Sequence, residues 1–240
     1  MLESGELAPI LTQGLTKLDI AAPPEAIAAF EAYYDLLEER GQSVNLTSIS
    51  GAEDVARLHF LDCIALLNAY DFKGSRVIDV GSGAGFPGAP LKITEPSLDL
   101  TLLDSTGKRV SFLSELCLVL EMDALCIHAR AEDAGREPGK REAYDIAVSR
   151  AVAQLNVLCE LCLPFVRLGG VFISMKGADC DEEIESARNA VKVLGAEIRE
   201  CYDYIIPGTE IKHRAVVIRK ISPTPDMYPR RFNRIKKRPL

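Results

Sequence analysis

Long hydrophobic runs are missing from this sequence of 240 residues. No apolar stretch approaches the ~20 residues that a helix needs to cross a bilayer. The first ten residues, MLESGELAPI, also lack the basic segment followed by an apolar segment that marks a secretory signal. These absences argue against a membrane-bound or exported chain, and we expect a cytoplasmic protein without a membrane partner.

A pattern of paired cysteines is missing as well. The seven cysteines are an odd number and lie mostly in apolar segments, where a thiol behaves as a small hydrophobic group. One C-x-x-C pair, Cys159 and Cys162, stands in the apolar stretch QLNVLCELCLPF, and no second Cys or His pair at ligand spacing accompanies it. We therefore expect reduced cysteines that pack in the core, and no metal site.

An overall excess of positive charge is also absent, because the formal net charge is −7. The distribution is uneven, however: residues 228–240, YPRRFNRIKKRPL, carry six basic residues and no acidic one. Tyr228 and Phe232 lie close to these arginines in the sequence and are expected to stack on unpaired bases. A disordered, solvated terminus is the alternative. The side chains expected to bind nucleic-acid phosphates are those of Arg230, Arg231, Arg234, Lys236, Lys237 and Arg238.

Hydrophobic residues, by contrast, are plentiful and make up 48% of the sequence. From Arg76 onward, short apolar runs alternate with longer segments of helical pattern. Strands are predicted in RVIDVG, LDLTLLD, ALCIHA, YDIAVSR and GGVFISMKG, with helices between most of them. This alternation is typical of an α/β, Rossmann-like fold, a mostly parallel twisted sheet with helices on both faces. The last two runs, EIRECYDYII and RAVVIRK, predict a terminal antiparallel strand pair.

Two helices are predicted before the first strand, over 24–40 and about 52–69. We therefore expect an N-terminal helical cap over residues 1–73, a cofactor-binding core over 74–221 and a basic C-terminal tail over 222–240. The chain is long enough for these three parts to form one folded unit.

A glycine-rich turn follows the first predicted strand, in VIDVGSGAGFPG at residues 77–88. Read as Gly83-x-Gly85-x-x-Gly88 it fits the dinucleotide fingerprint, and read from Asp79 as D-x-G-x-G-x-G it fits the S-adenosylmethionine (SAM) turn of class I methyltransferases. Prolines at 87 and 90 remove amide donors from the next helix, which disfavours a pyrophosphate. Asp79 suits a cationic or amine-bearing ligand, with capping of loop amides as the alternative.

Asp104 ends the second predicted strand, where a carboxylate accepts hydrogen bonds from ribose hydroxyls. NAD and SAM both carry a ribose, so Asp104 does not separate them. An NAD-linked oxidoreductase therefore stays open as an alternative, although no Tyr-Lys or His-Asp site for hydride chemistry is recognisable. A non-catalytic RNA-binding or cofactor-sensing protein is a second alternative.

Several short motifs are spread over most of the chain, and they carry a family resemblance. They are Asn45-Leu46-Thr47, His59-Phe60-Leu61-Asp62, DVGSGAGFPG, Asp104-Ser105 with Lys108-Arg109, Ser149-Arg150-Ala151-Val152-Ala153, and Lys176-Gly177. In their order and spacing the chain resembles the RsmG (GidB) family of bacterial methyltransferases. The resemblance implies a class I methyltransferase fold, SAM as cofactor, and methylation of guanine N7 in the 530 loop of 16S ribosomal RNA. The implied partner is 16S rRNA or the small ribosomal subunit, and we expect a monomer.

The resemblance also implies where the cofactor binds. Together with the glycine turn, the expected contacts are Asp79, Gly81, Gly83, Phe86, Asp104, Ser105, Thr106, Ala131, Glu132 and Arg150. Glu132 and Asp133 could instead form a solvated loop pair. Two features depart from the family pattern: GQSVNLT lacks the usual Trp-Asn before NLT, and Cys63 replaces the usual serine after HxLD.

Guanine N7 carries an in-plane lone pair and no proton, so its methylation needs no general base. Such a site needs donors that hold guanine O6 and the neighbouring phosphates. The candidates are Asn45, His59, Arg130, Arg150 and Lys176. Structural alternatives are pairs of Arg130 with Glu132, Arg150 with Asp145 and His59 with Asp62, whereas a buried strand-end lysine needs either a function or a partner.

Overall fold

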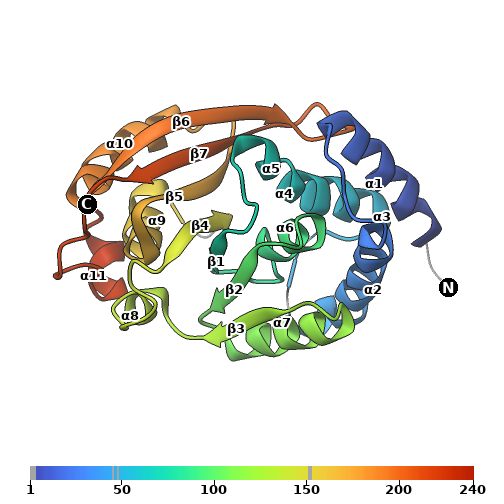
Figure 1. Cartoon of the computed structure of the whole chain (residues 1–240), viewed down its shortest axis with the longest axis horizontal. Coiled ribbons are helices and arrows are strands. Elements are labelled where there is room, and N and C mark those ends of the chain that lie inside the picture. Colours follow the sequence, from blue (N-terminus) through green and yellow to red (C-terminus); the bar gives the residue numbers. More distant parts are fainter. Residues whose placement is uncertain (1–3, 45, 48, 151–152) are drawn as a thin grey trace.

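A seven-stranded sheet forms the centre of the molecule, in the order β3-β2-β1-β4-β5-β7-β6 (Figure 1). The computed structural model describes residues 4–44, 46, 47, 49–150 and 153–240. Strands β1 to β5 run parallel, and β7 pairs antiparallel with both β5 and β6. The predicted α/β class, mostly parallel sheet and terminal antiparallel pair are confirmed. The strands are β1 (Arg76–Val80), β2 (Asp99–Asp104), β3 (Ala124–His128), β4 (Tyr144–Arg150), β5 (Val166–Gly177), β6 (Ala196–Ile205) and β7 (Lys212–Lys220).

The chain reverses its direction of winding at β1, which pairs with β2 on one side and with β4 on the other. In such sheets ligands bind in the crevice outside the carboxyl ends of the strands at this switch point. The glycine turn follows β1, Asp104 ends β2 and Arg150 ends β4. The topology therefore brings these three features to one edge of the sheet.

Successive side chains of the central strands enter two separate cores, as the twofold alternation of a strand requires. Val77 and Ile146 belong to the first core, whereas Ile78 and Ala147 belong to the second. The first core is covered by α1 (Ser4–Leu18), α2 (Ala26–Val44), α6 (Gly88–Thr94) and α7 (Gly107–Val119), on the right in Figure 1. The second is covered by α8 (Ala131–Ala134), α9 (Leu155–Cys162), α10 (Asp181–Val193) and α11 (Phe232–Lys237), on the left.

Cys159 and Cys162 are fully buried in the second core, in agreement with the packing role expected from their apolar segment. In the described ranges, no helix combines the length and the apolar character needed to cross a membrane.

The helices before β1 differ from the prediction in two ways. Helix α1 was not predicted, whereas the helix predicted over 24–40 is α2 and extends to Val44. The helix predicted over about 52–69 is present, but its hydrogen-bond pattern is not that of one regular α-helix: it passes through α3 (Ala52–Val55), a π-helical turn (Ala56–Leu61), α4 (Asp62–Ile64) and α5 (Leu66–Ala69). Such wide turns are frequent at functional sites. This one carries His59.

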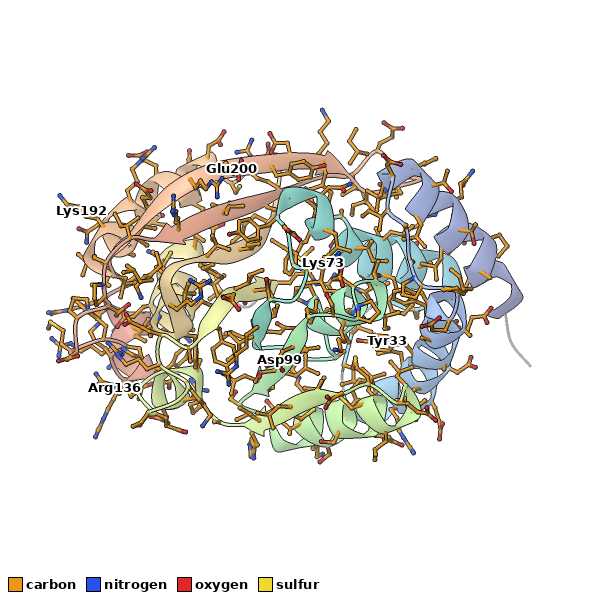
Figure 2. The ribbon with its side chains drawn as sticks, in the orientation of Figure 1. Tyr33, Lys73, Asp99, Arg136, Lys192 and Glu200 are labelled. Carbon is orange, nitrogen blue, oxygen red and sulfur yellow. The ribbon has the colours of Figure 1, made fainter. Side chains whose placement is uncertain are left out.

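The C-terminal tail lies against the second core, so the alternative of a disordered terminus is wrong. Tyr228 and Ile235 are buried, and a short 3-10 turn (Leu163–Phe165) after α9 belongs to the same core. Arg136, labelled in Figure 2 at this end of the molecule, donates to the backbone carbonyls of Asp226, Met227 and Pro229 at 2.8–3.2 Å. An exposed arginine from the segment after α8 thus binds the tail at several residues.

Candidate active site

Two adjoining cavities lie at the carboxyl edge of the sheet. The apolar cavity, of about 110 Å³, is lined by Leu103, Ala131, Glu132, Leu161 and Phe232 among others. The polar cavity, of about 360 Å³, is lined by residues that include Thr47, His59, Gly83, Phe86 and Arg150. Both cavities are also lined by Gly81, Asp104 and Ser105. Because they share these residues, a single elongated ligand can occupy both.

The glycine turn forms the floor between the two cavities. Gly81, Gly83 and Gly85 have φ values of 78°, 59° and 100°, in the left-handed region that glycine adopts at little cost. A Cβ on Gly83 would meet only the carbonyl oxygen of Gly81, at 3.9 Å, whereas a Cβ on Gly85 would lie 2.6 Å from the hydroxyl of Tyr33. The backbone at Gly83 is therefore open to a ligand, and Gly85 is required for packing against α2.

Asp79 lies beneath this turn and is fully buried. Its Oδ2 accepts a hydrogen bond from the Gly88 amide at 2.9 Å, and its Oδ1 has no partner among the described residues. Burial raises the pKa of Asp79 to about 7. The side chain lines neither cavity. The geometry is that of the loop-capping alternative, and a direct cofactor contact by Asp79 stays a prediction.

Asp104 stands where the two cavities meet and is only 3% exposed. Its Oδ2 accepts from the Gly83 amide at 3.0 Å and its Oδ1 accepts from the Thr106 amide at 2.8 Å. Each oxygen keeps a second lone pair for a ligand hydroxyl. Thr106 is the N-cap residue of α7 and lines neither cavity, so in this arrangement it orients Asp104.

The far wall of the apolar cavity comes from the segment after β3. The Nε of Arg130 donates to Glu132 Oε1 at 3.0 Å, so the structural alternative of an Arg130–Glu132 pair is present. The guanidinium carbon of Arg130 lies 4.4 Å from the centre of the Phe232 ring. Arg130 therefore stands with the predicted cofactor contacts Ala131 and Glu132, not with His59 and Arg150.

Arg150, at the end of β4, is the centre of a buried polar cluster on the wall of the polar cavity. Its Nη2 donates to His59 Nδ1 at 2.9 Å, and its Nη1 donates to Asp62 Oδ2 at 3.3 Å and to the carbonyl of Leu58 at 3.2 Å. The structural alternative of an Arg150–Asp145 pair is wrong. Asp145 lies near the opposite edge of the sheet, where it accepts from Arg167 at 2.6 Å.

Phe86 belongs to the glycine turn and packs against the cluster. The His59 ring stacks on it with 4.4 Å between ring centres, and the Arg150 guanidinium carbon lies 4.7 Å from its centre. Tyr33 stacks on it at 5.5 Å and donates to the carbonyl of Ala84. Phe86 thus has a fixed orientation beside the polar cavity.

The hydrogen bonds of His59 determine its tautomer. Because Nδ1 accepts from Arg150, Nε2 carries the proton and donates to Thr47 Oγ1 at 2.7 Å. Burial and the Arg150 charge lower the pKa of His59 to about 3. The predicted alternative of a bond to Asp62 is wrong, since Asp62 binds Arg150 instead. His59 is a neutral ring at ordinary pH.

Three residues of this site were missed by sequence reasoning. Tyr204 of β6 donates from its hydroxyl to Asp62 Oδ1 at 2.8 Å, and His213 Nδ1 lies 2.8 Å from the same oxygen. The third is Tyr33, which packs on Phe86. Tyr204 and His213 are paired across β6 and β7, but no local pattern indicates that this hairpin ends beside the helical cap.

Of the other two predicted guanine-binding residues, Lys176 lies away from the cavities, and Asn45 is not described by the structure. Lys176 of β5 donates to Glu183 Oε1 at 2.6 Å and to the carbonyl of Ala153 at 2.9 Å, and it lines neither cavity. It has the partner that a buried lysine needs, and holds residue 153 near α10. Asn45 lies outside the described residues.

The basic tail divides into one buried and several exposed cations. Arg230 forms a two-point ion pair with Glu160, which is fully buried on α9, at 2.8 Å (Nε–Oε1) and 2.6 Å (Nη2–Oε2). Its predicted contact with phosphate is therefore replaced by a structural pair. The expectation that Tyr228 stacks on bases is also wrong, because the ring is buried. The exposed members are Arg231, Arg234, Lys236, Lys237 and Arg238.

Solved structures with a similar arrangement confirm the predicted fold class. TrmN from Thermus thermophilus matches with a TM-score of 0.52 at 19% identity, over 66% of this chain and 48% of that one. The branched-chain polyamine synthase of T. thermophilus matches with a TM-score of 0.58 at 14% identity, over 85% and 65% of the two chains. At such identities the likeness shows the fold alone.

Sequence comparisons are more specific. The family model GidB, described as rRNA small subunit methyltransferase G, matches residues 26–204. Two relatives named ribosomal RNA small subunit methyltransferase G, from Alkaliphilus oremlandii and Pelotomaculum thermopropionicum, are 46% and 45% identical over 237 residues. Each alignment covers 98% of this chain and 99% of the relative. The chain therefore belongs to the GidB family, the rRNA small subunit methyltransferases G.

Proposed function

We propose that this protein transfers a methyl group from SAM to N7 of a guanine in the 530 loop of 16S rRNA, in free RNA or in the small ribosomal subunit. The observation that carries the proposal is that the Arg150–His59–Phe86 wall faces the same space as the glycine turn and Asp104. The names of the relatives support the small-subunit rRNA. Guanine N7 and the 530 loop come from the family resemblance. The cytoplasmic location and the monomeric state stay predictions.

The residues around the two cavities fit SAM. Asp104 has free lone pairs for ribose hydroxyls, the apolar cavity offers non-polar walls for adenine beside Ala131 and Glu132, and Gly83 leaves the strand end open. When bound there, SAM supplies an electrophilic methyl group on a sulfonium sulfur. The family membership and this fit favour the methyltransferase over the NAD-linked alternative.

The polar cavity is lined by hydrogen-bond donors that would hold a guanine, and His59 provides no free general base there. One ring nitrogen of His59 accepts from Arg150, and the other is protonated and donates to Thr47. Guanine N7 loses no proton when it is methylated, so this arrangement suits the reaction. Positioning alone is able to supply ~7–11 kcal/mol of the barrier reduction.

Arg150 is the group that we expect to position the guanine. A guanidinium has five N–H donors, and only part of them is used by His59, Asp62 and Leu58. The remaining donors would hold guanine O6, the acceptor next to N7. Because Asp62 neutralises the Arg150 charge, the pair does not oppose the positive charge that develops on the methylated base.

A labelled methyl-transfer assay tests the proposal. The protein is incubated with methyl-labelled SAM and either naked 16S rRNA or purified small subunits, with 23S rRNA as the control substrate. We expect label in small-subunit RNA only, found as N7-methylguanine by mass spectrometry. SAM binding without transfer to either substrate would favour the non-catalytic alternative, and NAD binding without SAM binding would favour the oxidoreductase.

A further inference from the structure

The C-terminal tail supplies one wall of the apolar cavity. Phe232, the first residue of α11, is half-buried and lines the cavity together with Ala131 of α8 and Leu161 of α9. The Arg130 guanidinium lies 4.4 Å from its ring centre. The family model ends at residue 204, so this aromatic wall comes from outside the matched region. A ring and a guanidinium at the edge of an apolar cavity form a surface on which a nucleobase stacks.

The position of Phe232 is determined by anchors on both sides of it. Before it, Arg230 pairs with the buried Glu160, and Arg141 donates to the carbonyls of Thr224 and Tyr228 at 2.7 and 2.8 Å. After it, Ile235 is fully buried in the second core. These contacts place the ring at the cavity. Within α11 itself Ile235 is the buried residue and Phe232 is half-buried, so a ligand bound to either side of the helix can further stabilise its position.

The same short segment presents cations to solvent. The side chains of Arg231, Arg234, Lys236, Lys237 and Arg238 are exposed, and all of them belong to α11 or adjoin it. A phosphate backbone that binds these side chains would fix α11 in place and would also fix the aromatic ring. When one ligand stabilises a given position of a segment, any other ligand that binds to the same position binds more tightly.

We propose that α11 couples the two substrates of this enzyme. On its inner side Phe232, together with Arg130, clamps the adenine of SAM, and on its outer side the basic residues bind RNA phosphates, so RNA tightens cofactor binding. The inference rests on the proposed function, which supplies both ligands. By linkage, the cofactor tightens RNA binding by the same factor.

The first test measures the affinity for the product S-adenosylhomocysteine by calorimetry without RNA. Phe232→Ala is expected to raise the Kd roughly tenfold, which corresponds to the loss of one base–aromatic stack. Phe232→Tyr keeps the ring and is expected to stay within about twofold of the native Kd. Unfolding curves of both variants show whether the tail is still docked. An unchanged Kd for Phe232→Ala overturns the inference.

The second test adds an RNA hairpin with the 530-loop sequence. We expect this RNA to tighten S-adenosylhomocysteine binding to the native protein at least fivefold, the lower range of allosteric coupling. The double variant Arg234→Ala/Lys237→Ala is expected to lose this tightening. The matched control Arg188→Ala/Lys192→Ala removes two exposed cations from α10 and should keep it (Lys192 is labelled in Figure 2).

The outcomes separate this inference from the proposed function. A double variant on α11 that retains the full tightening overturns the coupling. A native protein that binds S-adenosylhomocysteine and methylates RNA, while Phe232→Ala binds equally well, overturns only the role of α11. A native protein that binds no S-adenosylhomocysteine at all overturns the proposed function itself.

Discussion

The two cavities are closed by walls of different construction. The wall of the polar cavity is a buried cluster in which Arg150, His59 and Asp62 each bind at least two partners, and it lies inside the region matched by the family model. The wall of the apolar cavity depends on Phe232, a half-buried ring in the tail outside that region. The difference indicates that the groups at the proposed guanine site are each held by several contacts, whereas the proposed cofactor site is closed by a segment at the end of the chain.

The strongest way to break the polar wall is Arg150→Ala. We expect methyl transfer to fall at least ~100-fold, as for the loss of one preorganised donor in other enzymes. The free energy of unfolding should also fall by about 3 kcal/mol, because Asp62 remains buried without its cation. Single-turnover transfer and urea unfolding measure the two effects.

Arg167→Ala is the control for this change, since Arg167 pairs with Asp145 near the other edge of the sheet and is half exposed. Its removal should cost less than about 1 kcal/mol and leave transfer unchanged. A transfer rate for Arg150→Ala within a few fold of the native rate would remove Arg150 from the centre of the site.

The ion pair of Arg230 with the buried Glu160 holds the tail that supplies the wall of the apolar cavity, and it can be removed by substitution. Arg230→Ala leaves the carboxylate of Glu160, which is fully buried, with only the backbone amide of residue 230 as a partner. We expect a loss of about 3 kcal/mol in the free energy of unfolding. The neighbouring and exposed Arg231→Ala should change it by less than about 0.5 kcal/mol. Equal effects in the two variants would mean that the ion pair does not hold the tail.

Asp104→Asn removes a negative charge at the point where the two cavities meet. Charge-assisted hydrogen bonds contribute ~1.5–3 kcal/mol, so the Kd for S-adenosylhomocysteine should rise roughly 10- to 150-fold. Asp99→Asn, at the opposite and exposed end of β2 and labelled in Figure 2, is the matched control and should bind normally. Calorimetry measures the Kd of both variants. If both variants bind normally, Asp104 is not the ribose contact.

The smallest expected effect is that of His59 protonation on the free energy of unfolding. The pKa of His59 is lowered to about 3 in the folded chain, against about 6.5 in the unfolded chain, so its contribution to stability is complete above pH 6.5 and is lost as the pH falls toward 3. Between pH 6 and pH 5 the native protein should lose about 1 kcal/mol more than His59→Gln. Urea unfolding at several pH values measures the difference, with the exposed His128→Gln as the control. Parallel slopes for the native protein and His59→Gln would contradict it.

Much of the fold, and the residues at the carboxyl edge of the sheet, could be predicted from local patterns. The apolar runs predicted the strands, and the parallel arrangement placed the glycine turn, Asp104 and Arg150 at one edge of the sheet. These features depend on residues that are close in sequence, and on the rule that parallel strands end at the same edge.

The partners of the buried charges were decided only by the tertiary structure. Arg150 binds Asp62, not Asp145, because the π-helical turn of the cap lies against the end of β4, and Asp62 also receives Tyr204 from a distant hairpin. The charge pattern predicts a solvent-exposed basic tail, yet Arg230 binds the buried Glu160. Periodicity and turn chemistry report on near neighbours, whereas the pairing of buried charges depends on which distant elements pack together.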